Sequence, residues 1–191
     1  ATSNVINEYS LETGTITDII TTSTGWFYTM AVSPNGKYLL AATGTSNFSY
    51  LFYDLETNQP TLVASSQVIG AGSETGIISI ADNGIASIIT GTRMVVYDFL
   101  HQAAVAQQNL PTWGVRTVIS ADGQYIFTEA GTVFLFKLVA GTLQQQWVSS
   151  PQIGQVKYYI FEPSRPSMAR ILIDQVMYTR NCDTWATENS F

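Results

Sequence analysis

The chain is a succession of short runs of β-branched and aromatic residues, each bounded by Gly, Asn, Asp or Ser. This pattern predicts antiparallel strands joined by tight turns. Helical spacing of apolar residues is nowhere sustained. The stretch from Leu100 to Gln108 has a helix-forming composition, but it is short and follows a strand, so we expect an edge strand there. The pattern predicts an all-β protein.

The predicted strands fall into three regular sets of four, a less regular fourth set and two strands within residues 5–20. Set by set they are Trp26–Ser33, Lys37–Thr43, Ser49–Leu55 and Thr61–Ser65; Gly76–Ile80, Ile85–Thr90, Met94–Phe99 and Ala103–Gln107; Val115–Ser120, Gln124–Glu129, Val133–Leu138 and Leu143–Val148; and Lys157–Phe161, Arg170–Asp174, Val176–Tyr178 and Thr184–Thr187. A longer connection is expected over Glu162–Ser167, because its two prolines oppose a regular strand.

Two markers repeat in phase along the chain. An aromatic, a polar and a usually aliphatic position recur at intervals of 44, 44, 39 and 42 residues, with Phe99 and Arg180 as the non-aliphatic third members. The markers begin at Tyr9, Tyr53, Tyr97, Phe136 and Tyr178. Turns recur with them at Ser33–Gly36, Ala81–Gly84, Ser120–Gly123 and, more weakly, Glu162–Arg165. This interval is the length of one four-stranded propeller blade.

The predicted fold is therefore a single β-propeller domain of four-stranded antiparallel blades. We expect a half blade in residues 1–25, full blades in residues 26–70, 71–112 and 113–154, and a last blade in residues 155–191. Two arrangements follow from these units. The N-terminal strands could complete the last blade of a small four-bladed ring, or the chain could be an arc of a larger ring completed by other residues or another chain.

The repeat resembles a known family in its motifs. The segments Val32–Gly44 and Leu51–Thr57 are similar to the repeat of YVTN propellers and to the broader WD-repeat-like group, and Ile119–Ile126 matches well. The resemblance implies a propeller fold. Proteins of this family include surface-layer proteins, lactonase-like enzymes and binding modules. The resemblance covers most of the chain but specifies architecture more than activity. The His and Trp-Asp signatures of strict WD repeats are absent.

Composition narrows the possible partners. The net charge of −6, with only eight Lys and Arg, argues against nucleic acid and anionic membranes. No apolar run is long enough for a membrane span. Charged residues make up only 12% of the chain, a composition that is common in secreted and surface β-proteins. We therefore expect an extracellular or cell-surface location, with a cytoplasmic one as the alternative.

The sequence excludes most known arrangements of catalytic residues. His101 is the only histidine and is expected in an exposed turn, and Cys182 is the only cysteine and is expected as a buried filler. An enzyme would need carboxylates from the set Glu74, Glu129, Glu162 and Asp174 to meet at the channel mouth. The other repeated aspartates, Asp54, Asp82, Asp98 and Asp122, are expected to form turns. We therefore predict a protein that is not an enzyme, with no metal and no cofactor.

Binding residues are expected at the loops that enter the innermost strand of each blade. The position ten residues before the end of each turn marker is occupied by Trp26, Glu74, Trp113 and Gln155. Aromatic area with a polar anchor would suit a protein or glycan partner; the alternative is that both tryptophans pack between blades. Asn47 begins an N-glycosylation sequon. Two further hypotheses are a structural subunit that self-associates through open blade edges and a lactonase-like hydrolase.

Overall fold

A computed structural model describes residues 5–21, 26–43, 49–57, 61–66, 77–149 and 156–190 of the chain. These residues form five antiparallel sheets and no helix. The half sheet contains β1 (Val5–Tyr9) and β2 (Ile16–Thr21), and the four other sheets contain four strands each. The prediction of an all-β fold of antiparallel sheets is confirmed.

Within every sheet the strands are hydrogen-bonded in chain order. The first sheet contains β3 (Phe27–Val32), β4 (Tyr38–Thr43), β5 (Ser49–Asp54) and β6 (Thr61–Ser66). The second contains β7 (Ile77–Ile80), β8 (Ile85–Thr90), β9 (Arg93–Asp98) and β10 (Ala103–Asn109). The third contains β11 (Arg116–Ile119), β12 (Tyr125–Ala130), β13 (Thr132–Val139) and β14 (Thr142–Val148). The fourth contains β15 (Val156–Glu162), β16 (Arg165–Ile173), β17 (Val176–Asn181) and β18 (Thr187–Ser190).

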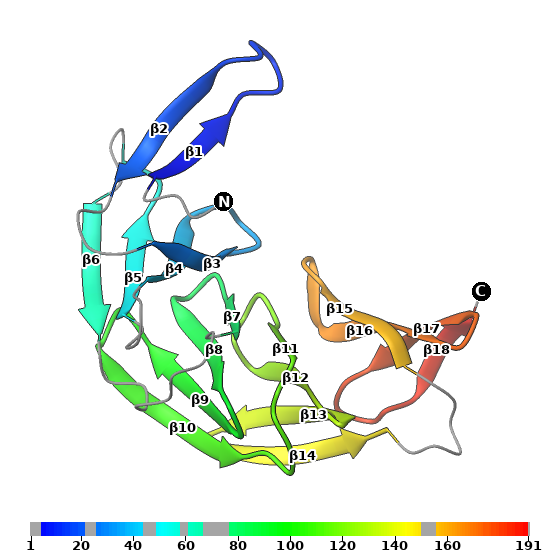
Figure 1. Cartoon of the computed structure of the whole chain (residues 1–191). Helices are drawn as coiled ribbons and strands as arrows, with labels where there is room; N and C mark the ends of the chain where they lie inside the picture. Colours follow the sequence, from blue (N-terminus) through cyan, green and yellow to red (C-terminus); the bar gives the residue numbers. More distant parts are fainter. Residues whose placement is uncertain are drawn as a thin grey trace.

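The sheets follow one another along an open arc, with the half sheet at one end and the fourth sheet at the other (Figure 1). The first strands β3, β7, β11 and β15 lie on the inside of the arc, and the last strands form its outside. The small four-bladed ring required the N-terminal strands to complete the last sheet. In the structure β1 pairs with β2, and the fourth sheet takes all four strands from residues 156–190.

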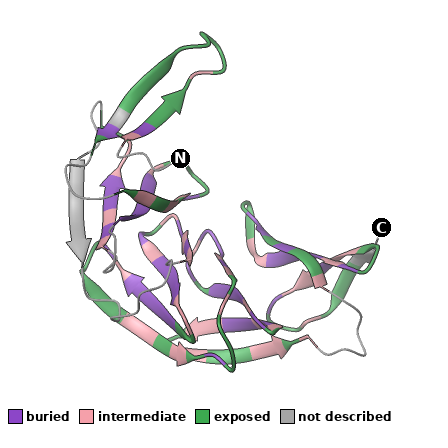
Figure 2. Ribbon diagram, in the orientation of Figure 1, coloured by how far each residue is buried: buried purple, intermediate pink, exposed green. Residues whose placement is uncertain are grey.

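The core lies between the sheets. Four clusters of buried apolar residues each join two neighbours along the arc. Between the first and second sheets, for example, the rings of Phe52 and Phe99 stack with their centroids 5.3 Å apart. Figure 2 shows buried stretches where sheets face one another, whereas the half sheet is mostly exposed. Each sheet is thus stabilised by its neighbours rather than by a core of its own.

In the repeated turns, one side chain accepts the hydrogen bonds that close the turn. In the β11–β12 turn, Asp122 accepts hydrogen bonds from the Ser120 hydroxyl (2.6 Å) and from the Gln124 amide (3.0 Å). Gly123 has φ of 76°, a value that favours glycine. Asn35 accepts the equivalent bonds in the first sheet.

The turns are also bonded to one another along one rim of the arc. The Asn35 amide donates to the Asp82 carboxylate (2.9 Å), and the Asp82 amide donates to the carbonyl of Ala121 (2.8 Å). The Asn83 side chain donates to the carbonyl of Asp122 (2.9 Å). These bonds join three successive sheets, so the turn marker of the sequence also fixes the spacing of the sheets at this rim.

Several predicted strand boundaries in the fourth sheet are wrong, and the starts of β16 and β18 show why. β16 begins at Arg165 and includes Pro166, where the sequence predicted a loop. The register shifts there from Phe161↔Ala169 to Glu162↔Arg165, so the proline lies in a bulge that needs no ladder bond from its nitrogen. β18 begins at Thr187 rather than Thr184, because Asn181 caps a turn that continues to Trp185, which has φ of 55°.

Removal of the Asp122 carboxylate should lower the free energy of unfolding. Asp122→Ala leaves the Ser120 hydroxyl and the Gln124 amide without their acceptor, at a cost of about 1–2 kcal/mol. Urea denaturation measures the difference. Glu12→Ala, which removes an exposed carboxylate from the half sheet, serves as the control and should cost less than about 0.5 kcal/mol. Equal stability of Asp122→Ala and the unmodified chain would show that the turn bonds contribute nothing.

The Cys182 thiol should be unreactive in the folded protein. Its side chain is buried, as the sequence predicted, and desolvation, followed by the charges of Asp183 and Asp122, raises the pKa of the thiol to about 12. Ellman's reagent at about pH 8 should therefore label the chain only after denaturation. Rapid stoichiometric labelling of the native chain would contradict the buried position.

Candidate interaction surface

The Trp113 loop, which we define as residues 110–115, connects β10 to β11 and is held firmly against the second sheet. The Leu110 amide donates to the Thr92 carbonyl (2.7 Å), and the Gly114 amide donates to the Gly91 carbonyl (2.9 Å). Gly114 is required by space: a Cβ there would lie 2.5 Å from Cγ2 of the buried Ile89. The sequence therefore folds this loop into a fixed position at the junction of two sheets.

The loop presents large apolar side chains to solvent. Trp113 is 61% exposed, and Val115, two residues further on, is exposed as well. The third sheet has neighbours on both sides, so this exposure does not come from a position at an end of the arc. An exposed tryptophan on a well-anchored backbone loses little conformational entropy on binding, which is the usual property of a residue that dominates an interface.

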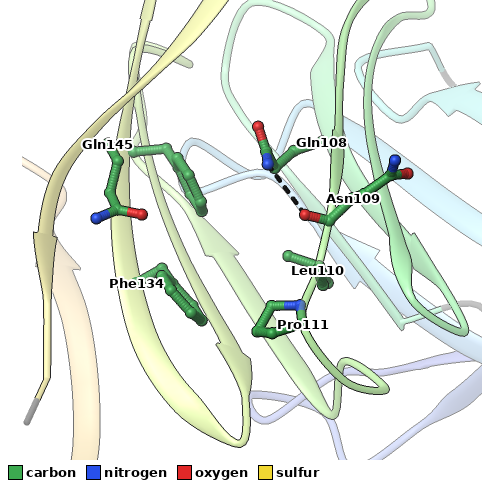
Figure 3. Close-up of a pocket in the computed structure, with 7 residues that line it drawn as sticks. Gln108, Asn109, Leu110, Pro111, Phe134 and Gln145 are labelled. Carbon is green, nitrogen blue, oxygen red and sulfur yellow. Dashed lines mark hydrogen bonds between the residues drawn. The ribbon is translucent and has the colours of Figure 1, made fainter.

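A pocket of about 380 Å³ opens beside the base of the loop. Figure 3 shows Gln108, Asn109, Leu110 and Pro111 on one side and Phe134 and Gln145 on the other, with Phe136 completing the lining. The Gln108 amide group donates to the carbonyl of Asn109 (3.0 Å). Side-chain amides both donate and accept hydrogen bonds. The pocket thus combines an apolar lining with amides that match the backbone of an extended peptide.

A more polar depression continues along β10 from the pocket. It is lined by Arg93, Gln107, Gln108 and Asn109, and the Arg93 guanidinium donates a hydrogen bond to the Gln107 side chain. Arg93 is exposed and belongs to β9, next to β10 in the same sheet. A carboxylate or a backbone carbonyl is the group that such a guanidinium would bind.

The structure places the two predicted tryptophans at the same rim of the arc. Trp26 directly precedes β3, and Trp113 lies three residues before β11; both side chains are exposed, Trp26 by 45%. The alternative in which they pack between blades is therefore wrong. Glu74, Gln155 and Asn47 lie outside the described residues. The structure thus describes two of the four predicted binding residues, with β7 between their strands.

The predicted carboxylates do not form one site among the described residues. Glu162 precedes β16 and Asp174 follows it, so a whole strand, roughly 30 Å long at about 3.3 Å per residue, separates them. Glu129 lies opposite Arg116 in the β11–β12 ladder, and Glu74 is outside the described residues. No group of three His, Cys, Asp or Glu that could hold a metal ion occurs in the described part of the chain.

Glu162 has a structural role. Its carboxylate accepts from Nε of Arg165 (2.8 Å) and from Nε of Arg170 (2.9 Å). These hydrogen bonds, with that of Arg170 the larger, hold the pKa of the Glu162 carboxyl below its usual value. A general acid needs a raised pKa, so this carboxyl is unsuited to that role.

The remaining polar residues that the sequence assigned to turns are found there. His101 is highly exposed in the β9–β10 turn, and its Nδ1 lies 2.7 Å from the Asp98 carboxylate. Asp98 also accepts from the His101 amide, and Asp54 accepts from the Glu56 amide. Asp82 differs in detail, because it accepts from Asn35 of the neighbouring sheet. These aspartates thus accept backbone hydrogen bonds at turns and stabilise the fold.

The pocket was not predicted from the sequence. Its lining comes from the last strand of the second sheet and the last two strands of the third, which are separated by the whole of β11 and β12. The amide-rich runs Gln107–Asn109 and Gln144–Gln146 were the available signal. Their facing positions follow only from the stacking of the sheets.

The comparisons with known proteins concern the fold alone. No protein-family model and no curated protein matches the chain. A chain in a crystal structure of the mitotic checkpoint complex is similar, with a TM-score of 0.70, 14% identity and coverage of 98% of this chain and 60% of that one. A functionally unknown protein from Desulfotomaculum acetoxidans DSM 771 is also similar, with a TM-score of 0.70, 20% identity and coverage of 98% and 62%.

The chain thus spans about 60% of the length of both solved chains. The likeness supports an all-β, propeller-like fold, and the YVTN resemblance remains one of sequence motifs. In the described residues, no helix has the length and apolar character needed to cross a membrane.

The ion pairs of Glu162 should make stability depend on acid pH. Because the folded pKa of Glu162 is lowered, its contribution is complete above the unfolded pKa, near 4.5, and is lost as the pH falls through the folded value. Glu162→Gln should therefore be less stable than the unmodified chain at neutral pH, and the difference should shrink below about pH 4. Thermal unfolding of both proteins across this range provides the measurement. A difference that does not change with pH would contradict the assignment.

Proposed function

We propose that the chain is a non-enzymatic propeller-type interaction module that binds a protein through the Trp113 loop and the pocket beside it. The observation that carries this proposal is the 61% exposure of Trp113 on a loop whose backbone is bonded to the neighbouring β8–β9 turn. Tryptophan is one of the residues enriched at the centres of protein interfaces.

The pocket supports a polypeptide as the ligand. Amides of Gln108 and Gln145 on its two sides can pair with the donors and acceptors of an extended backbone, and Phe134 and Pro111 can receive an apolar side chain. One fold neighbour belongs to a protein complex, which fits a binding role on the same frame. A net charge of −6 favours a neutral or basic partner.

The absence of catalysis is part of the same proposal. His101 is exposed in a turn, the Cys182 thiol is buried with a raised pKa, and Glu162 is held in ion pairs. These environments do not favour a catalytic role for any of the three groups. A location outside the cell or at its surface is consistent with a surface that carries few charges.

Substitution of Trp113 should weaken peptide binding. Peptides selected on the unmodified chain from a phage-displayed random library are expected to bind Trp113→Ala at least tenfold more weakly, because a central aromatic contact is lost. Fluorescence anisotropy with labelled selected peptides measures the affinities. Val139→Ala, which shortens an exposed apolar side chain at the opposite rim, is the matched control and should bind as the unmodified chain does.

Two results would overturn this function. One is equal affinity of the selected peptides for Trp113→Ala and the unmodified chain. The other is a screen in which no peptide binds while a glycan array yields a ligand that Trp113→Ala no longer binds, since the partner would then be a sugar. Unchanged near-ultraviolet circular dichroism outside the tryptophan signal would show that the fold of the variant is intact.

A further inference from the structure

β10 is the outermost strand of the second sheet, and within the described residues it pairs with β9 alone. The Leu110 amide donates to the Thr92 carbonyl, so these two residues form a hydrogen-bonded pair. In an antiparallel ladder such pairs alternate with pairs that exchange no hydrogen bond. Gln107 and Asn109 belong to the second kind of pair. Their main-chain N–H and C=O groups therefore point away from β9.

The later part of this outer edge is open to a further strand. The Gln108 side chain donates to the outward carbonyl of Asn109 (3.0 Å), a bond that the amide of a neighbouring strand would otherwise make (Figure 3). Earlier along β10 the β13–β14 turn comes close, since a Cβ on Gly141 would lie 3.5 Å from the carbonyl oxygen of Val105. We define the β10 edge as residues 107–109.

Two depressions flank the β10 edge, one on each face of the second sheet. Leu110 belongs to a buried cluster shared with the third sheet, and the pocket of about 380 Å³ lies on that face. Val95 belongs to the cluster shared with the first sheet. Arg93 is two residues from Val95 on β9 and opposite Asn109, so it shares this other face, where a polar depression of about 450 Å³ lies. In Figure 3 the Asn109 side chain points away from Gln145.

The two depressions differ in chemistry. The rings of Phe134 and Phe136, with centroids 5.9 Å apart, give the pocket an apolar wall. On the other face Arg93 is exposed and donates to the Gln107 side chain. Within the described residues Arg93 has no ion pair, whereas four other cations do: Lys37, Lys137, Arg165 and Arg170. Arg93 can therefore bind a carboxylate from a ligand.

We propose that the β10 edge binds an extended peptide segment in which an apolar residue and an acidic residue are neighbours. This inference rests on the proposed function and specifies the partner. The segment adds to β10 as a further strand through the outward groups of Gln107 and Asn109. Successive side chains of a strand point to opposite faces, so the apolar side chain enters the pocket beside Phe134 and the adjacent carboxylate binds Arg93.

The position of Arg93 favours an acidic side chain over a chain terminus. Arg93 lies beside an open strand edge, along which a bound peptide continues in both directions, whereas terminal carboxylates are usually bound by clustered backbone amides. The net charge of −6 disfavours a strongly acidic partner. The partner segment therefore carries a single carboxylate among neutral residues.

Synthetic octapeptides test the required spacing. Two rhodamine-labelled, C-terminally amidated probes, Thr-Thr-Thr-Leu-Asp-Thr-Thr-Thr and its Asp-Leu counterpart, cover both strand directions. At least one should bind the full chain saturably in fluorescence anisotropy. Replacement of Asp by Asn should weaken binding of that probe at least tenfold, because the charge-assisted bond is lost. Insertion of one Thr between Leu and Asp should do the same, because both side chains then point to one face.

A charge exchange tests the role of Arg93. Arg93→Glu should bind the probe at least tenfold more weakly, and it should bind a version with Lys in place of Asp more tightly than the unmodified chain does. A gain of affinity for the Lys version cannot result from misfolding. Lys37→Glu makes the same change in net charge on the first sheet and is the matched control. Its affinity for the probe should stay within about twofold of the unmodified chain.

Hydrogen exchange measured by NMR tests the strand addition. At saturating probe the outward amides of Gln107 and Asn109 should exchange at least tenfold more slowly. The Gln108 amide, which faces β9, should change little. Binding without slower exchange of the two outward amides would overturn the proposal.

Other outcomes would also overturn it. These are no saturable binding up to about 1 mM probe, equal binding of the Asn version, and equal binding of the version with the inserted Thr. If a free C-terminal carboxylate restored the affinity of the Asn version, the anion would be a chain terminus instead. The proposed function fails separately, when library-selected peptides bind Trp113→Ala unchanged. If those peptides lose affinity for Trp113→Ala but not for Arg93→Glu, only the present inference fails.

Discussion

Packing between neighbouring sheets is the interaction on which the whole structure depends. A four-stranded sheet of this length has two apolar faces and cannot bury either alone. In the arc each inner sheet presents one face to the preceding sheet and one to the following sheet, as the buried clusters around Phe52, Phe127 and Ile126 show. The turn-to-turn bonds from Asn35 to Ala121 keep this stacking in register at one rim.

The fold was predictable because its signals are local. Alternation of apolar residues gives the strands, and the Ser-x-Asp-Gly turn needs only its own side chains to close. Errors arose where the pattern of residues did not show a local irregularity of the backbone. Pro166 is accepted in β16 because a bulge removes the need for its missing amide hydrogen, and β18 starts late because the turn capped by Asn181 continues to Trp185, whose ring stacks on Trp147 of the third sheet with the centroids 4.3 Å apart.

The candidate surface was predictable only in part. Trp26 and Trp113 could be located by counting back from the turns, because that spacing fixes the rim at which they lie. The pocket could not, since Phe134 and Gln145 meet Gln108 only after two sheets have stacked. The choice between a ring and an arc was likewise open in the sequence.

Every strand pair in the described sheets joins strands that are consecutive in the chain. Loop closure therefore costs little entropy for each pair, and a hairpin can form before distant parts of the chain meet. Ordered structure can begin in any sheet and spread to its neighbours, as expected for a nearly one-dimensional array. Cooperativity should accordingly be strongest in the second and third sheets, which have a four-stranded neighbour on each side, and local opening should begin at the half sheet, which has two strands and one neighbour.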